Sequence, residues 1–164
     1  MSMEQILETV RGLDGVLELA PTEGSEFPEI AWGDHFFYYA PDGQIPQRVQ
    51  PYATVVTKDY PGDTLCDLDS PGRRRLNIHV SRATFTRLIG DDPRNAPTVA
   101  DFTATDVLLP HPVYARQGWI AIVNPAEVTT VAAIELLRES HESARRRATR
   151  RASTEVGDED SRSR

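Results

Sequence analysis

Residues 108–144 read LLPHPVYARQGWIAIVNPAEVTTVAAIELLRESHESA, and most other elements of the chain can be placed against them. Trp119 to Val123 is a run of five apolar residues that follows Gly118. Runs this short and rich in β-forming residues are typical of a central strand. A turn at Asn124 and Pro125 comes next, followed by the longest helical pattern of the chain. The stretch therefore predicts a short edge segment, a buried strand, a sharp turn and a long helix.

The pattern after the turn predicts a helix that begins at Pro125. Asn124 can accept hydrogen bonds as the N-cap, and Pro125 suits the first helical position, where its missing N–H costs nothing. Glu127 can bond back to the cap. One face of this helix carries Ala133, Leu136, Leu137, Ser140 and Ala144, with Ile134 and His141 at its rim. This face is expected to cover one side of a sheet.

The rest of the chain predicts mainly strands. The expected elements are a helix over residues 2–12 capped by Ser2, strands over 16–20, 30–32, 35–40, 52–60 and 75–80, and a helix over 81–90. Residues 91–105 predict a long surface loop. Consecutive strands with short connections pair antiparallel, and three helices are too few for both faces of a five- or six-stranded sheet. We expect an α+β two-layer sandwich, mainly antiparallel, with helices on one face.

Composition bounds the domains and the partners. The 164 residues suffice for one domain, expected over 1–147, and residues 148–164 predict a disordered polar tail. Residues 1–143 carry 11 basic and 21 acidic side chains, which argues against broad nucleic-acid binding. No apolar run approaches the ~20 residues of a membrane span, so no membrane is expected. The single cysteine, Cys66, favours a reducing cytoplasm without disulfides.

Four motifs carry a family resemblance: WGDHFFYYAPDG at 32–43, VVTKDYPGD at 55–63, RRLNIHV at 74–80 and HPVYARQGWIAIVNP at 111–125. Over residues 3–147 the chain resembles an uncharacterised bacterial family with a domain of unknown function, of the DUF6194 type. More distantly, the order of elements is similar to the MmcQ/YjbR-like fold. The resemblance implies a fold and a bacterial cytoplasmic setting. It implies no activity, cofactor or site residue.

Strand alternation predicts a polar face on the side of the sheet without helices. In the strand over 75–80, Arg75, Asn77 and His79 face that side, because the residues between them are apolar. The register of the strands over 35–40 and 54–60 is left open, so either Lys58 or Asp59 joins them. The candidate ligand-binding residues are His35, Tyr39, Lys58, Asp59, Arg75, Asn77, His79, Tyr114 and Trp119. Cations beside aromatic rings can hold a small anionic or planar ligand, although exposed polar strand positions are also ordinary.

Other chemistries have weaker signals. The loop over 59–69 holds four aspartates, but their spacing matches no calcium loop. The four histidines show no zinc-binding spacing, and no nucleotide-binding or serine-hydrolase motif occurs. Cys66 lies in no nucleophile signature. We therefore expect no metal and no cofactor.

Three functions remain open. The first is a small cytoplasmic binding or accessory module that uses the open sheet face for a ligand or a protein partner. The second is a small enzyme with acid–base chemistry, pairing His35 or His79 with Asp59 or Asp63. The third is a nucleic-acid-associated protein acting through the arginines of 145–151. A concave cleft that joins a histidine to a carboxylate would favour the enzyme. The oligomeric state is left open.

Overall fold

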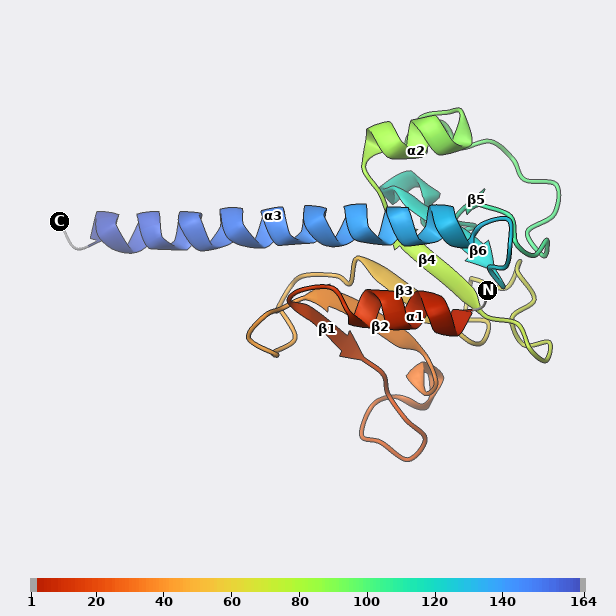
Figure 1. Ribbon diagram of the computed structural model, residues 1–164, viewed down its shortest axis with the longest axis horizontal. Helices are drawn as coiled ribbons and strands as arrows, with labels where there is room; N and C mark the ends of the chain where they lie inside the picture. The colour runs from red at the N-terminus through yellow and green to blue at the C-terminus, as the bar shows by residue number, and fades with distance from the viewer. Residues whose placement is uncertain (1–2, 163–164) are drawn as a thin grey trace.

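The computed structural model describes residues 3–162. An open six-stranded antiparallel sheet, in the order β1-β2-β3-β4-β6-β5, carries three α-helices (Figure 1). The strands are β1 (Val16–Leu19), β2 (His35–Tyr39), β3 (Ala53–Val56), β4 (Arg75–His79), β5 (Leu109–Pro110) and β6 (Trp119–Val123), and the α-helices are α1 (Met3–Arg11), α2 (Arg82–Ile89) and α3 (Thr130–Arg162). The predicted α+β class is confirmed.

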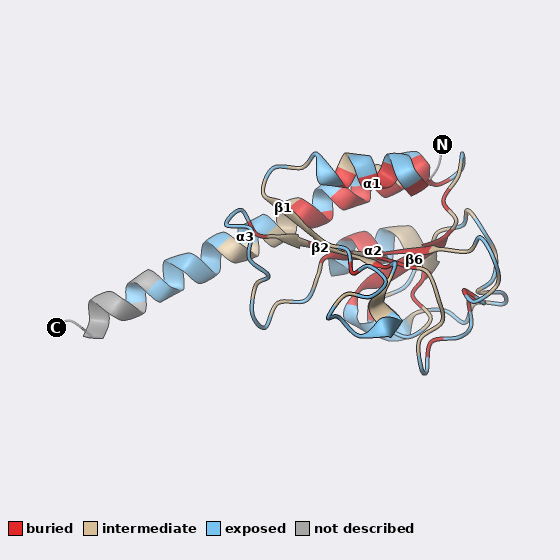
Figure 2. Cartoon of the chain, turned by 90° about the horizontal axis from the view of Figure 1, so that it is seen from below, coloured by how far each residue is buried: buried red, intermediate tan, exposed pale blue. Residues whose placement is uncertain are grey.

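The core lies between the sheet and the helices. Figure 2 shows the buried residues of α1 on the side that faces the sheet. The predicted inner face of α3 is confirmed, since Ala133, Leu136, Leu137 and Ser140 are all buried. β6 is the buried central strand that the sequence predicts, with all five residues buried. The helices therefore cover one face of the sheet and leave the other to loops.

Most other elements agree with the sequence within a residue or two. The Ser81 hydroxyl caps α2 by accepting the N–H of Thr84 at 3.1 Å, and Gly90 ends α2 with φ +95°. The loop over 91–105 contains one short 3₁₀ helix, η2 (Pro93–Asn95). The predicted cap Ser2 lies outside the described residues.

α3 begins at Thr130, not at Pro125 as the sequence predicts. Asn124 does not cap the helix, because its side chain is engaged elsewhere. Its Oδ1 accepts the N–H of Arg74 at 2.9 Å, and its Nδ2 donates to the carbonyl of Gly72 at 3.1 Å. Asn124 thus ties the end of β6 to the start of β4.

Asp106 supplies the missing cap from outside the helix. Its carboxylate accepts three backbone N–H bonds, from Ala126, Val128 and Thr129, and the Thr129 hydroxyl. Although desolvation raises the pKa of Asp106, these bonds lower it to about 2. The turn that leads into α3 is therefore organised by a residue 24 positions before the helix.

α3 continues to Arg162, where the sequence predicts a disordered tail from residue 148. From Thr130 to Val156 the chain contains no glycine or proline, and alanine and arginine are strong helix formers. An ion pair between Glu142 and Arg145 adds support. The end of α3 projects beyond the sheet (Figure 1). None of the helices described between residues 3 and 162 has the length and apolar character needed to cross a membrane.

Two predicted strands differ from the structure. Glu29–Ala31 forms a 3₁₀ helix, η1, because the N–H groups of Ala31 and Trp32 donate to carbonyls three residues earlier. β3 ends at Val56 rather than Tyr60, because the N–H of Thr57 leaves the sheet and donates to the Asp34 carboxylate at 2.9 Å.

Candidate ligand pocket on the open face of the sheet

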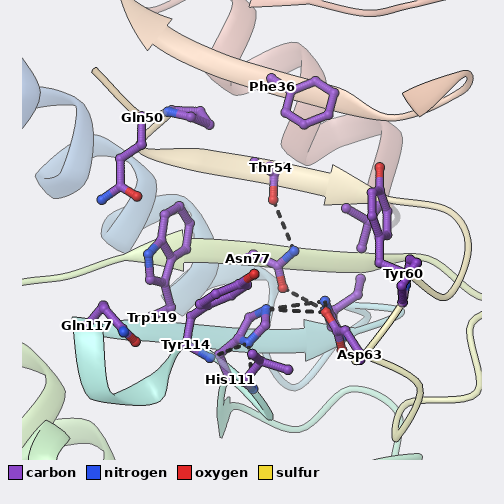
Figure 3. Close-up of a pocket in the computed structure, with 16 residues that line it drawn as sticks. Phe36, Gln50, Thr54, Tyr60, Asp63, Asn77, His111, Tyr114, Gln117 and Trp119 are labelled. Atoms are coloured by element: carbon purple, nitrogen blue, oxygen red, sulfur yellow. Dashed lines mark hydrogen bonds and ion pairs between the residues drawn. The ribbon is translucent and has the colours of Figure 1, made fainter. Parts of the chain in front are cut away.

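A pocket of about 490 Å³, the open-face pocket, lies against β2, β3, β4 and β6 on the side opposite the helices. The register brings its floor together, because Phe36, Thr54 and Asn77 are direct neighbours on three adjacent strands. Segments 60–63 and 111–117 close its sides. Figure 3 labels ten residues that line it: Phe36, Gln50, Thr54, Tyr60, Asp63, Asn77, His111, Tyr114, Gln117 and Trp119.

Arg75 of β4 lies at the bottom of the open-face pocket and is 2% exposed. Its guanidinium makes two bonds to the Asp63 carboxylate, Nη1 to Oδ1 at 2.9 Å and Nη2 to Oδ2 at 2.6 Å. Its Nε donates to Oδ1 of Asn77 at 2.8 Å, and Nη1 also donates to Sγ of Cys66 at 3.4 Å. Buried charges are tolerated when they are paired and hydrogen-bonded. This ion pair therefore brings no net charge to the pocket.

His111 joins the network from the segment between β5 and the 3₁₀ helix η3 (Ala115–Gln117). Its Nδ1 accepts the N–H groups of Val113 and Tyr114, both at 3.0 Å, so the neutral ring carries its proton on Nε2. Nε2 lies 3.2 Å from Nη2 of Arg75, itself a donor, and 3.9 Å from Oδ2 of Asp63. Among the described residues, the Nε2 proton has no acceptor at hydrogen-bond distance.

Burial and pairing determine the ionisation of this network. Burial and the Arg75 guanidinium lower the pKa of His111 to about 3, against the opposite effect of Asp63. Burial raises the pKa of Asp63, but the bonds and charge of Arg75 outweigh it and hold this pKa below its usual value. At neutral pH the pocket therefore presents a neutral imidazole beside a carboxylate that an arginine already binds.

Amide side chains with free hydrogen-bonding groups form a second polar part of the pocket. Nδ2 of Asn77 donates one hydrogen to the Thr54 hydroxyl at 3.0 Å, which leaves its second hydrogen. Within residues 3–162, the side-chain amides of Gln50 and Gln117 have no hydrogen bond. Figure 3 shows both at the end of the pocket where Trp119 lies.

Four of the nine predicted site residues come together in the open-face pocket. Arg75 and Asn77 extend from β4, Trp119 from β6, and Tyr114 from the loop that precedes η3. The rings of Tyr114 and His111 are 5.1 Å apart between centroids. The predicted orientation of Arg75 and Asn77, away from the helices, is confirmed.

His79 shares the open face but does not line this pocket. Its Nε2 donates to the carbonyl of Gln117 at 2.9 Å, and its ring meets Trp119 edge-on at 5.5 Å between centroids. Burial lowers the pKa of His79, although the Gln117 carbonyl acts against this. His79 therefore supports one wall of the pocket from behind.

The prediction that His35 and Tyr39 lie on the open face is wrong. Both residues share a side of β2 with Phe37, which is buried in the core beneath the helices. The Tyr39 ring packs edge-on against His141 of α3, at 5.5 Å between centroids. Nδ1 of His35 is 2.8 Å from the Glu18 carboxylate. The register of β2, which the sequence leaves open, determines this result.

Neither Lys58 nor Asp59 lies on the open face, because β3 ends before them. Nζ of Lys58 donates to the buried Asp34 carboxylate at 3.0 Å and to the carbonyl of Trp32 at 2.8 Å. The Asp59 carboxylate accepts the N–H of Leu68 at 2.9 Å. These bonds hold both side chains in the loop structure.

The polar network of the pocket is largely absent from the sequence prediction. Asp63 enters the prediction only in the enzyme alternative and among the four aspartates of the 59–69 loop, and His111 shows no spacing with it that would suggest proximity. Phe36 and Thr54 become visible only once the register of β2 and β3 is known. Gln50 lies in an irregular segment, where periodicity carries no information.

Metal chemistry has no cluster to support it. Among the side chains that the structure describes, no group of three or more histidines, cysteines, aspartates or glutamates is placed to hold a metal ion. Cys66 is buried, and its sulfur accepts a hydrogen bond from Arg75.

The model of DUF6194, a family of unknown function, matches residues 1–153. The chain belongs to this family. The predicted resemblance to it is confirmed, while membership assigns no activity. No curated protein and no solved structure matches the chain, and the likeness to the MmcQ/YjbR-like fold is not shown.

Proposed function

We propose that the protein is a small-molecule-binding module whose ligand lies in the open-face pocket. The observation that carries this proposal is a cavity of about 490 Å³ with aromatic walls and a buried hydrogen-bonded network at its base. Ligand sites are commonly cavities of about 300–1,000 Å³, mostly apolar, with a few fixed polar groups.

The rigid arrangement of the polar groups in the pocket supports the binding proposal. Arg75, Asp63 and Asn77 hold one another in fixed positions, so little conformational freedom remains to be lost when a ligand enters. Preorganised sites gain affinity in this way. Tyr114 and Val113 are partly exposed at the pocket and leave it open to solvent.

A small enzyme is the second candidate, because the pocket is concave and contains both His111 and Asp63. It ranks lower for two reasons. A histidine with a pKa of about 3 is a weak base at neutral pH, where catalytic bases work best with a pKa near the working pH. Asp63 is already bound on both oxygens by Arg75.

A bacterial cytoplasmic setting and a distant relation to the MmcQ/YjbR-like fold are part of the same proposal. The single cysteine supports a reducing compartment, and the order of helix, sheet and final strand-helix pair supports the fold relation. A protein partner on the open face is the alternative occupant.

A thermal-shift screen of metabolites tests the proposal with two matched variants. Val113→Trp adds bulk at the pocket, and Val131→Trp adds the same bulk to an exposed site on α3. A ligand at a hundredfold excess over its Kd stabilises the native state by about 2.7 kcal/mol. We expect hits that stabilise the wild type and Val131→Trp but not Val113→Trp. Hits that survive Val113→Trp would contradict the proposed site.

A further inference from the structure

We infer that the ligand of the open-face pocket is an uncharged planar heterocycle that carries a ring carbonyl. This inference rests on the proposed function and specifies its ligand class. It replaces the sequence expectation of an anionic or planar ligand with the planar, uncharged case.

Charge balance excludes a charged ligand. The charged side chains that line the pocket are Asp63 and Arg75, and they neutralise each other. The guanidinium is itself out of reach, because Arg75 is 2% exposed. Four of its five hydrogens bond to Asp63, Asn77 and Cys66, and the fifth faces the protonated Nε2 of His111. A phosphate or carboxylate would therefore lose its hydration without gaining a cation.

The walls favour a flat ring. Phe36, Tyr60, Tyr114 and Trp119 present aromatic surface to the cavity, and flat aromatic surfaces pair well with planar rings. The hydroxyl of Tyr60 is turned away to Asp34, so only its ring is available to a ligand. A sugar-like ligand would need hydroxyl-binding groups where these rings lie.

The polar groups of the pocket that lack partners favour a ligand whose ring edge carries both hydrogen-bond donors and acceptors. His111, which is 4% exposed, lines the cavity with an Nε2 proton that has no acceptor among the described residues. A ring carbonyl would supply that acceptor. The amides of Gln50 and Gln117 each donate and accept, and they match the N–H and carbonyl groups of a cyclic amide.

The test uses Trp119 as the reporter. The chain contains two tryptophans, and Trp32 lies outside the pocket. Trp32→Phe therefore leaves Trp119 as the single tryptophan, which can be excited selectively over the tyrosines. The probes are hypoxanthine, purine, inosine 5′-monophosphate, benzoate and glucose. Hypoxanthine and purine form a matched pair, because they differ by the carbonyl oxygen and the ring protons that accompany it. Thermal shifts of the wild type and of Trp32→Phe with the same probes are compared, to check that the substitution has not altered the fold.

We expect hypoxanthine to change Trp119 emission and to bind at least about fivefold tighter than purine, the effect of one hydrogen bond. Inosine 5′-monophosphate should bind no tighter than hypoxanthine, and benzoate and glucose should leave the emission unchanged. Gln117→Ala and Gln50→Ala should each raise the Kd for hypoxanthine by about fivefold to tenfold. Gln47→Ala, an exposed glutamine outside the pocket, is the control and should have no effect.

The outcomes separate the two levels of the proposal. Tighter binding of benzoate or of inosine 5′-monophosphate, or equal binding of hypoxanthine and purine, would overturn the ligand class and leave the pocket as a binding site. No emission change and no stabilisation with any probe would overturn the ligand class. If the metabolite screen also gave no hit that Val113→Trp abolishes, the binding module would fall with it.

Discussion

His111 is a buried base that remains neutral. Its Nδ1 accepts two backbone N–H groups, and Arg75 lies beside its Nε2. A proton added to the ring would meet donors and a positive charge, and it would be shielded from water. The low pKa of His111, about 3, follows from these contacts.

This pKa predicts how stability depends on pH. Below about pH 6.5 the His111 ring binds a proton in the unfolded chain but not in the folded protein. The contribution of His111 to folding stability is therefore complete above pH 6.5 and is lost as the pH falls toward 3. The slope from this group is at most about 1.4 kcal/mol per pH unit. Urea unfolding between pH 7.5 and 4.5 should show a shallower loss in His111→Asn than in the wild type. Equal slopes would contradict the assigned state of His111.

The Arg75–Asp63 pair predicts strong coupling between two substitutions. Arg75→Met leaves a buried carboxylate without its partner, and breaking a buried ion pair costs about 3–5 kcal/mol. Asp63→Asn combined with Arg75→Met should recover part of this loss, because no unpaired charge then remains. A double-mutant cycle by urea unfolding measures the coupling. Additive effects would mean that the two side chains do not act as a pair.

At the scale of elements, the N-terminus of α3 depends on Asp106. Its φ of +55° suits aspartate and asparagine better than alanine, and its carboxylate bonds three N–H groups. We expect Asp106→Ala to cost about 1–2 kcal/mol of stability and Asp106→Asn to cost less. Asp91→Ala, at an exposed loop position, is the control in thermal unfolding. A loss in Asp91→Ala as large as in Asp106→Ala would contradict the capping role.

The Asp106 cap also shows which features of the fold local sequence patterns cannot predict. Local patterns predicted β4, β6 and the inner face of α3, because alternation and helical periodicity lie within each element. The predicted start of α3 was wrong, because the residue that caps it is distant in sequence and the Asn124 side chain bonds to the chain before β4 instead. The predicted orientation of His35 and Tyr39 was wrong, because strand register depends on the neighbouring strands and cannot be predicted from one strand alone.

The residues of the pocket likewise divide into those that local sequence patterns predict and those that only tertiary packing brings together. Arg75, Asn77 and Trp119 could be predicted, because each lies on a strand whose inward and outward faces differ clearly in polarity. Asp63 and His111 come from irregular segments that tertiary packing alone brings to Arg75.

At the scale of the whole molecule, the projecting end of α3 contributes little to the fold. Residues 149–155 are exposed, and Figure 1 shows this part of the helix beyond the sheet. We expect a chain that ends at Ser153, where the family match ends, to keep its unfolding free energy within about 0.5 kcal/mol. Thermal unfolding and light scattering check this. A large loss of stability, or a change in oligomeric state, would assign the helix end a packing role.

The location of the ligand is the central claim, and backbone amide NMR tests it most directly. The protein is titrated with the compound that stabilises it most in the screen, and the shifts of ¹H–¹⁵N signals are mapped on the structure. The proposal predicts the largest shifts at Gly62, Asp63, Val113, Tyr114 and Trp119, together with the indole signal of Trp119. Largest shifts on the helix side instead, around residues 40–47 and 148–152, would contradict it.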